Sequence, residues 1–196
     1  MEYLINWITG NWIEICGAII SLFYLYFSYK QIIWLWLFGL LSALFYIWIY
    51  FDSGFYADMS LQIYYVAVSL YGWFHWSAGG NNAGGKSSIK VVGVRRKEGV
   101  ILLLVFLFLW LVISQVLIRF TNSQISVMDA LTTSGSIVAT WMLARKVLEH
   151  WLIWIVVDAI SLGLYIYKGL YATAILFLVY TIVAVAGYYA WKKDMK

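Results

Sequence analysis

The feature that most constrains the fold is a succession of apolar runs, each about 20 residues long. A run of that length, wound as a helix, crosses the hydrocarbon core of a bilayer. The chain has 196 residues, of which 64% are hydrophobic and 11% charged, whereas roughly 25% of the residues in soluble domains are charged. The runs do not alternate apolar and polar residues, as the strands of a membrane barrel do. The sequence therefore predicts an all-α polytopic membrane protein.

The apolar runs predict seven transmembrane helices, at about residues 12–29, 31–51, 57–76, 100–118, 125–144, 151–165 and 172–191. The fourth run is almost purely aliphatic and aromatic, which suits a connecting helix that faces lipid. The fifth is rich in small and hydroxylated residues, which let helices approach closely and form hydrogen bonds across their interface. Residues 2–9 are too short to span and are expected to lie in the membrane interface.

The composition changes abruptly over residues 77–98, which are rich first in glycine and then in lysine and arginine. This stretch predicts a flexible basic linker. We therefore divide the chain into an N-terminal three-helix repeat with its short interfacial segment (1–76), a basic cytoplasmic linker with the connecting helix (77–124), and a C-terminal three-helix repeat (125–196).

An internal repeat appears when the chain is compared with itself at an offset of 115 residues. Spans one to three then match spans five to seven and leave the fourth unmatched. The matched pairs include Trp36 with Trp151, Tyr50 with Tyr165, Gly54 with Gly169, Tyr65 with Tyr180, Gly72 with Gly187 and Trp76 with Trp191. The pattern predicts two parallel three-helix repeats joined by a linker helix, the 3+1+3 arrangement of SWEET-type transporters.

The distribution of basic residues predicts the orientation of the chain. With seven spans, 11 of the 13 Lys and Arg residues fall on the side that holds the linker and the C-terminus. The positive-inside rule makes that side cytoplasmic and places the N-terminus outside. The basic residues are thus explained by membrane topology, and we predict no nucleic-acid partner.

A polar and aromatic stripe in the sixth span is the first candidate site. Its members follow helical spacing and share one face: Trp151, Trp154, Asp158, Ser161 and Tyr165. A carboxylate near the middle of a span costs about 2.5–3.5 kcal/mol, so Asp158 should face protein or water. Such a face could hold a flat polar or cationic molecule. The alternative is that Asp158 pairs with Gln62, a threonine of the fifth span or a tyrosine, and holds the helices together.

A second stripe lies in the third span and consists of Gln62, Tyr65, Ser69 and Trp73. Its counterparts in the seventh span are Phe177, Tyr180, Ala184 and Tyr188, so the two repeats differ in polar content. Four aromatic residues lie near helix ends and fit an interfacial aromatic belt: Trp73, Trp76, Tyr188 and Trp191. Tyr65, Tyr180 and Trp154 lie too deep for a belt and are assigned to the site.

The sequence lacks the residue patterns that are typical of an enzyme active site. The two histidines lack a cysteine or carboxylate cluster at metal-ligand spacing, so we predict no metal site. No phosphate-binding glycine loop and no serine-histidine-aspartate arrangement is present. We therefore predict a protein that is not an enzyme and has no cofactor.

Two longer motifs run through these spans. One is Trp151-x-x-Trp154-x-x-x-Asp158, followed by Tyr165-x-Tyr167-Lys168-Gly169-Leu170-Tyr171-x-Thr173 and Gly187-Tyr188-x-x-Trp191. The other is Gln62-x-x-Tyr65-x-x-x-Ser69-x-Tyr71-Gly72-Trp73-x-x-Trp76. Together they resemble the PnuC family of bacterial vitamin transporters. The resemblance implies a SWEET-like fold, a homotrimer and uptake of a non-phosphorylated vitamin across the bacterial inner membrane. It also implies that Gln62, Trp154 and Asp158 lie in the vitamin site, with Trp151 beside them.

The resemblance implies transport by facilitated diffusion, with a cytoplasmic kinase that traps the product. Members of the family carry nicotinamide riboside, and relatives carry thiamine or riboflavin. Nicotinamide riboside is our first candidate and thiamine the second, because both contain a cationic aromatic ring that tryptophan and tyrosine faces attract. Proton coupling through Asp158 is an alternative within transport. A membrane scaffold or sensor that transports nothing is the less favoured hypothesis.

Overall fold

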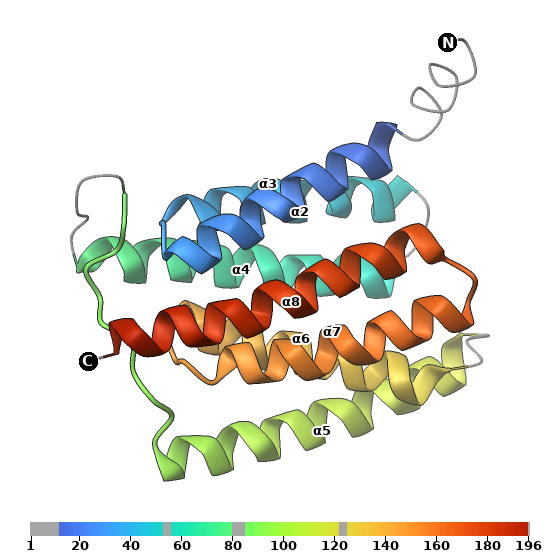
Figure 1. Cartoon of the computed structure of the whole chain (residues 1–196). Coiled ribbons are helices and arrows are strands. Elements are labelled where there is room, and N and C mark those ends of the chain that lie inside the picture. Colours follow the sequence, from blue (N-terminus) through green and yellow to red (C-terminus); the bar gives the residue numbers. More distant parts are fainter. Residues whose placement is uncertain (1–11, 53–55, 80–84, 122–124, 196) are drawn as a thin grey trace. The chain divides into compact units, whose positions relative to one another are not determined.

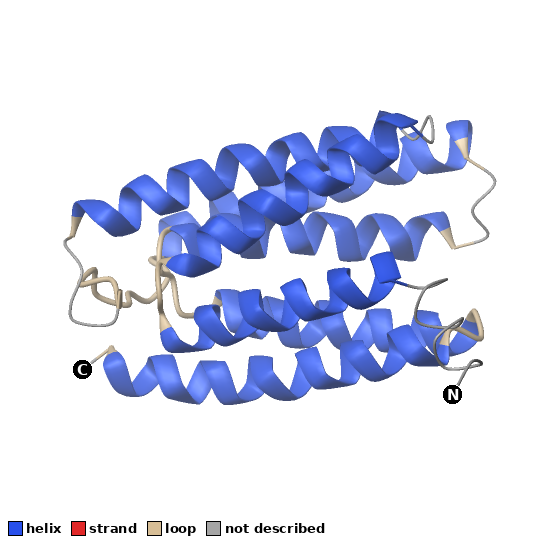
Figure 2. Cartoon of the chain, turned by 90° about the horizontal axis from the view of Figure 1, so that it is seen from above, coloured by secondary structure: helices blue, strands red, loops and turns tan. Residues whose placement is uncertain are grey.

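The computed structural model describes residues 12–52, 56–79, 85–121 and 125–195. They form seven helices and the loops between them, without strands in these four ranges (Figures 1 and 2). The helices are α2 (Trp12–Lys30), α3 (Trp34–Asp52), α4 (Tyr56–Ala78), α5 (Arg96–Phe120), α6 (Ser126–Ala144), α7 (His150–Tyr167) and α8 (Tyr171–Asp194). Each lies over a predicted span, and the ends differ by a few residues. The predicted interfacial segment 2–9 and most of the glycine-rich part of the linker lie outside the described residues.

Contacts divide the chain into two compact units, residues 1–89 and 90–196. In the N-terminal unit α3 packs against both α2 and α4, and in the C-terminal unit α7 packs against both α6 and α8. The middle helix of each group of three therefore carries the packing, as expected of a repeat. Helix α5 belongs to the C-terminal unit and packs against α6.

Helix α5 has the character predicted for a lipid-facing connection. Ser114 is its one buried residue, and apolar side chains are exposed along its length. Among the described helices, three are long and apolar enough to cross a membrane on length and composition alone, namely 96–120, 150–167 and 173–194.

The same tryptophan contact occurs in each unit. Trp36 of α3 meets Trp76 of α4 edge to face, with ring centroids 5.5 Å apart, and lies on Gly72. A Cβ atom added at Gly72 would come within 2.4 Å of the Trp36 ring. The equivalent rings in the C-terminal unit, Trp151 of α7 and Trp191 of α8, are 5.7 Å apart. This contact confirms the repeat that the sequence offset predicts.

Gly187 plays the part of Gly72 in the C-terminal unit. A Cβ atom added there would lie 2.6 Å from the Trp151 ring. All four tryptophans of the two contacts are at most 1% exposed. The assignment of Trp76 and Trp191 to an interfacial belt is therefore wrong, because each ring packs against the tryptophan of the middle helix. We define these two groups, Trp36–Gly72–Trp76 and Trp151–Gly187–Trp191, as the tryptophan–glycine contacts.

The first helix of each triplet ends in the same way. Gln31 and Lys146, which are 115 positions apart, have positive φ angles of 57° and 54°. The amide of the following residue bonds to a carbonyl five residues back: Ile32 to Phe27 at 2.9 Å, and Val147 to Met142 at 3.0 Å. This is the Schellman ending, in which a left-handed residue lets the last carbonyls find donors.

The linker forms hydrogen bonds with both of these turns, and in each turn it contacts the same two backbone groups. In the N-terminal unit, the Ser87 amide donates to the Gln31 carbonyl at 3.2 Å and the Ile33 amide donates to the Gly85 carbonyl at 3.1 Å. In the C-terminal unit, Val92 donates to the Lys146 carbonyl at 3.0 Å and accepts from the Leu148 amide at 2.8 Å. Ile33 and Leu148 are also equivalent positions. Each turn therefore presents one carbonyl and one amide to a segment of the linker.

Glu149 adds a side-chain contact to the second of these turns. The Val94 amide, just before α5, donates to Glu149 Oε2 at 2.8 Å in a partly buried position. By contrast, Glu98 in the first turn of α5 meets Arg145 at 3.7 Å, and both side chains are exposed. Burial makes the first contact the stronger of the two.

Replacing the contact glycines should destabilise the protein. Gly187→Ala and Gly72→Ala each place a methyl group inside the van der Waals distance of a buried indole, and overpacking costs about 1–3 kcal/mol. Gly163→Ala in α7 is the control, because a Cβ atom there meets nothing within 4 Å. It should be neutral or stabilise by up to about 1 kcal/mol through helix propensity. Denaturant unfolding in detergent measures all three, and equal effects would contradict the packing role.

The two glutamates should differ in the free energy of unfolding they contribute. Glu149→Ala leaves the Val94 amide without its acceptor and should cost about 1–3 kcal/mol. Glu98→Ala removes only an exposed ion pair and should cost less than about 1 kcal/mol. The same unfolding measurement separates them, and a larger loss from Glu98→Ala would reverse the assignment.

Candidate functional site

The predicted stripe of α7 faces inward over much of its length. Trp151, Asp158 and Ser161 are buried, with exposures of 1%, 4% and 7%, while Trp154 and Tyr165 are half-buried. The helix has the i, i+3, i+7 spacing that gathers these residues on one side. The C-terminal unit therefore presents one carboxylate, one hydroxyl and three aromatic rings along a single face of α7.

Among the described residues of the C-terminal unit, the Asp158 carboxylate has no hydrogen-bond or ion-pair partner. The threonines of α6, which the sequence offered as partners, bond instead to their own helix. Thr133 donates to the Asp129 carbonyl at 2.8 Å and Thr140 to the Ser136 carbonyl at 2.7 Å. The packing alternative for Asp158 therefore has no partner in α6.

The other hydroxyls of α6 behave in the same way. Ser134 donates to the Ala130 carbonyl, and Ser136 donates to the Thr132 carbonyl at 2.9 Å. Our expectation that this helix bonds across its interface is wrong for these residues, because a serine or threonine in a helix can satisfy itself on the preceding turn. The small residues of α6 still let this helix approach α7 closely. A Cβ atom added at Gly135 would lie 2.6 Å from Val157 Cγ2 of α7.

Two predicted tyrosines are joined by a phenylalanine. Tyr165 of α7 stacks on Phe177 of α8 with centroids 5.0 Å apart, and Phe177 meets Tyr180 at 5.4 Å. The fold thus connects Tyr165 and Tyr180 through a ring that the sequence prediction left out of the site. Phe177 was visible as the repeat counterpart of Gln62, which is the signal that could have included it.

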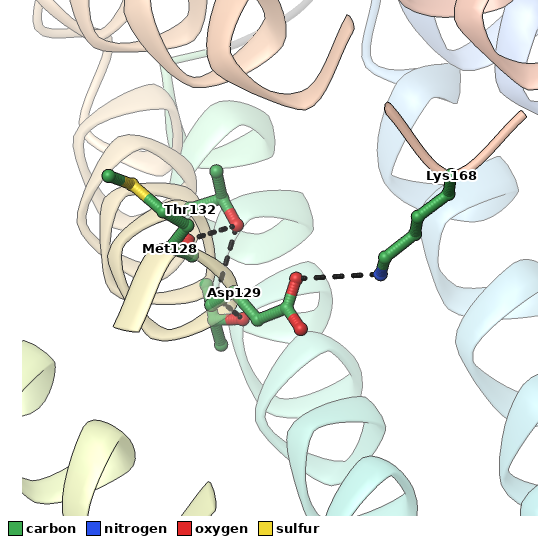
Figure 3. A network of polar contacts seen from close by, with 5 residues as sticks. Met128, Asp129, Thr132 and Lys168 are labelled. Carbon is green, nitrogen blue, oxygen red and sulfur yellow. Dashed lines mark hydrogen bonds and ion pairs between the residues drawn. The ribbon is translucent and has the colours of Figure 1, made fainter. Parts of the chain in front are cut away.

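A charged pair lies close to these rings. Lys168 Nζ, in the turn after α7, is 3.8 Å from Asp129 Oδ1 near the start of α6 (Figure 3). The Thr132 hydroxyl donates to the carbonyls of Met128 at 3.2 Å and Asp129 at 3.0 Å, which fixes this first turn of α6. Asp129 also interacts electrostatically with Tyr165. The sequence analysis gave no sign of this pairing between Asp129 and Lys168.

Trp151 and Trp154 have different surroundings. The Trp151 ring is enclosed by Gly187, by Trp191, and by His150 at a centroid distance of 4.6 Å. Its indole nitrogen has no hydrogen-bond partner among the described residues. Trp154, one turn further along α7, remains half-buried. The structure therefore gives Trp151 an extensive packing role and leaves part of the Trp154 ring accessible.

In the N-terminal unit the predicted stripe lies on α4. Ser69 is 5% exposed, and Gln62 and Tyr65 are half-buried. The Tyr65 ring meets Tyr64 at 5.5 Å. A residue that the sequence analysis missed also lies here. Tyr24 of α2 reaches Gly39, next to Ser69.

The comparison with protein families decides the assignment. The model of the nicotinamide mononucleotide transporter family matches residues 11–193. The chain belongs to this family. It is a multi-pass membrane protein and a vitamin transporter of the PnuC type, not an enzyme, as the motifs predicted.

Curated relatives and a solved structure agree with this assignment to the family. The chain is similar to the nicotinamide riboside transporter PnuC of Escherichia coli (strain K12), with 24% identity over 92% of this chain and 85% of that one. It is also similar to the riboflavin/roseoflavin transporter RibM of Streptomyces davaonensis, with 25% identity over 92% of this chain and 84% of that one.

The structural match is to a crystal structure of the vitamin B3 transporter PnuC. The TM-score is 0.77 at 21% identity, over 99% of this chain and 86% of that one. At this identity the match shows the fold, and it confirms the seven-helix prediction.

Trp151 should contribute to stability more than an exposed tryptophan does. Trp151→Leu removes a ring packed on Gly187 and Trp191, and a large-to-small change in such a position should cost at least about 2 kcal/mol. Trp48→Leu is the matched control, because Trp48 is 68% exposed, and should change the free energy of unfolding by less than about 0.5 kcal/mol. Normal stability of Trp151→Leu combined with lost vitamin binding would instead indicate a direct ligand contact.

Proposed function

We propose that this transporter takes up nicotinamide riboside, a non-phosphorylated vitamin, by facilitated diffusion. The observation that carries the proposal is the buried Asp158, which has no cationic partner among the described residues of the C-terminal unit. A buried carboxylate is costly unless a positive charge or hydrogen bonds offset the loss of water. The cationic ring of nicotinamide riboside supplies such a charge, and the half-buried ring of Trp154 on the same helix face supplies a stacking surface.

The proposed site comprises eight of the residues that the sequence analysis singled out. They are Gln62, Tyr65 and Ser69 of α4, Trp151, Trp154, Asp158 and Tyr165 of α7, and Tyr180 of α8. The amide and hydroxyl groups among them can bond to a ribose and a carboxamide. Recognition by aromatic rings with a few polar groups is typical of small-molecule sites.

The family description names a mononucleotide, but the chemistry of these eight residues favours the riboside. A phosphate is bound by arginine, lysine or a cluster of backbone amides. The eight residues include one carboxylate and no lysine or arginine. A phosphate dianion near Asp158 would add like-charge repulsion, whereas the riboside carries only its ring cation.

Two other vitamins remain as alternatives within the family. Thiamine shares the cationic aromatic ring and would use the same carboxylate. Riboflavin is favoured by the similarity to RibM, and its neutral ring system would use the aromatic residues without Asp158. Proton coupling through Asp158 is a further alternative, because carboxylates within the membrane can carry protons. A scaffold without transport is the weakest alternative for a chain of this family.

The cellular setting is also part of the proposal. Facilitated diffusion only equalises concentrations, so net uptake requires a cytoplasmic kinase that phosphorylates the vitamin and prevents its return. We place the chain in the bacterial inner membrane as a homotrimer surrounded by lipid. The bias of basic residues favours a cytoplasmic C-terminus and an outside N-terminus.

Titration of the purified protein with nicotinamide riboside, thiamine, riboflavin and nicotinamide mononucleotide tests the substrate. The 12 tryptophans supply the fluorescence signal. Nicotinamide riboside should bind most tightly and the mononucleotide most weakly. Tightest binding of riboflavin would move the assignment to the RibM-like alternative, and saturable uptake into liposomes would exclude a scaffold.

Asp158→Asn should weaken the binding of cationic vitamins selectively. The variant keeps the shape of the side chain but removes its charge. We expect a loss of binding free energy of about 1.4–2.8 kcal/mol, which corresponds to a 10- to 100-fold higher Kd. Nicotinamide riboside and thiamine should show this loss, while riboflavin should change less than about threefold. Glu98→Gln, an exposed carboxylate-to-amide change in the same unit, is the control.

The same variant tests proton coupling in liposomes. In facilitated diffusion, a pH gradient should leave nicotinamide riboside uptake by the wild-type protein unchanged. Uptake that follows the gradient in the wild type and loses this dependence in Asp158→Asn would establish coupling and contradict the uniport mechanism.

A further inference from the structure

Tyr24 lies beside the polar stripe of α4 although it belongs to α2. A Cβ atom added at Gly39 would be 3.3 Å from Tyr24 Cε2 and 3.1 Å from Ser69 Oγ, so the tyrosine ring and the serine hydroxyl meet at this glycine. The Tyr24 side chain also lies near those of Tyr65 and Tyr64 of α4. Its phenol therefore lies close to two of the residues proposed to bind the vitamin, Tyr65 and Ser69.

Among the described residues of the N-terminal unit, the Tyr24 hydroxyl has no hydrogen-bond partner. The packing of α2 on α3 does not depend on this hydroxyl, because phenylalanines provide the ring contacts between the two helices. Phe38 of α3 meets Phe23 at 5.6 Å and Phe27 at 5.3 Å. Tyr24 thus carries a polar group that packing does not require.

The repeat offers a physical reason for a ring at this place. Gly39 corresponds to Trp154, Tyr24 to Ala139 and Ser69 to Ala184. In the N-terminal unit the second helix has a glycine and the first helix supplies the ring. In the C-terminal unit the first helix has an alanine and the second supplies the ring of Trp154. Each unit therefore carries one large aromatic residue at these exchanged positions.

We propose that Tyr24 is a specificity-determining residue that contacts the vitamin from the N-terminal unit. This inference rests on the proposed function, because it requires an aromatic vitamin as substrate. The Tyr24 hydroxyl forms a hydrogen bond with a polar substituent of the vitamin, such as a ribose hydroxyl or a carboxamide, and Gly39 leaves the space in which the ring is held. Tyr24 is the N-terminal counterpart of Trp154 in function, although the two occupy different helices of the repeat.

The test compares Tyr24→Phe with Tyr26→Phe in vitamin binding and thermal stability. Tyr26 lies on the same helix and is 52% exposed, so its variant controls for loss of a tyrosine hydroxyl. Tyr24→Phe should raise the Kd for nicotinamide riboside about fivefold, the loss expected for one hydrogen bond. Tyr26→Phe should change it less than twofold, and both variants should unfold at the wild-type temperature.

Tyr24→Leu removes the ring face as well and should raise the Kd at least about tenfold. Wild-type Kd values in both Tyr24 variants, with or without a lower unfolding temperature, would overturn the inference and leave a packing role. Failure of the wild-type protein to bind any of the vitamins would overturn the proposed function and this inference together. The two failures are therefore distinguished by the wild-type titration.

Discussion

The tryptophan–glycine contact is the interaction on which each unit depends. Lipid is as apolar as the helix surfaces, so membrane helices gain little from hydrophobic burial against one another and associate through close packing. A glycine in the last helix of each triplet lets the indole of the middle helix lie directly on the backbone. A second tryptophan, on the last helix, packs edge to face against this indole. An indole makes many dispersion contacts at once, which is why one ring on a glycine can hold two helices together.

The second constraint is the turn between the first two helices of each triplet. Gln31 and Lys146 adopt a left-handed conformation that costs a non-glycine residue about 1–2 kcal/mol. Both side chains are buried, at 4% and 0% exposure, which would not be so for a glycine at either position. In return, the chain turns sharply and exposes the carbonyl and amide to which the linker bonds. The linker is thereby ordered where it meets each unit, although its composition predicts flexibility.

Sequence periodicity and self-comparison predicted the seven helices, the repeat, and the identical residues of the tryptophan–glycine contacts. They could not find features in which the repeats match in conformation but not in residue type, such as the turns at Gln31 and Lys146. Nor could they find a ring that one unit carries on a different helix. Gly39 aligns with Trp154 in the repeat and looks like a mismatch, until Tyr24 is seen to reach the glycine. The hydroxyls of α6 show a different limit. The composition predicts that they form hydrogen bonds, but only the structure shows that the acceptors are carbonyls of their own helix.

The two units are alike where they pack and unlike where the candidate site residues lie. Asp158 corresponds to Ala43, and both side chains are buried, at 4% and 2% exposure. A small apolar residue therefore satisfies this position of the three-helix unit, and the fold does not require a carboxylate there. The carboxylate adds a desolvation cost that no described side chain of the C-terminal unit offsets through a hydrogen bond or ion pair. A carboxylate that the packing does not need supports the proposal that Asp158 serves a bound ligand, and the cationic ring of nicotinamide riboside would supply a charge opposite to that of the carboxylate.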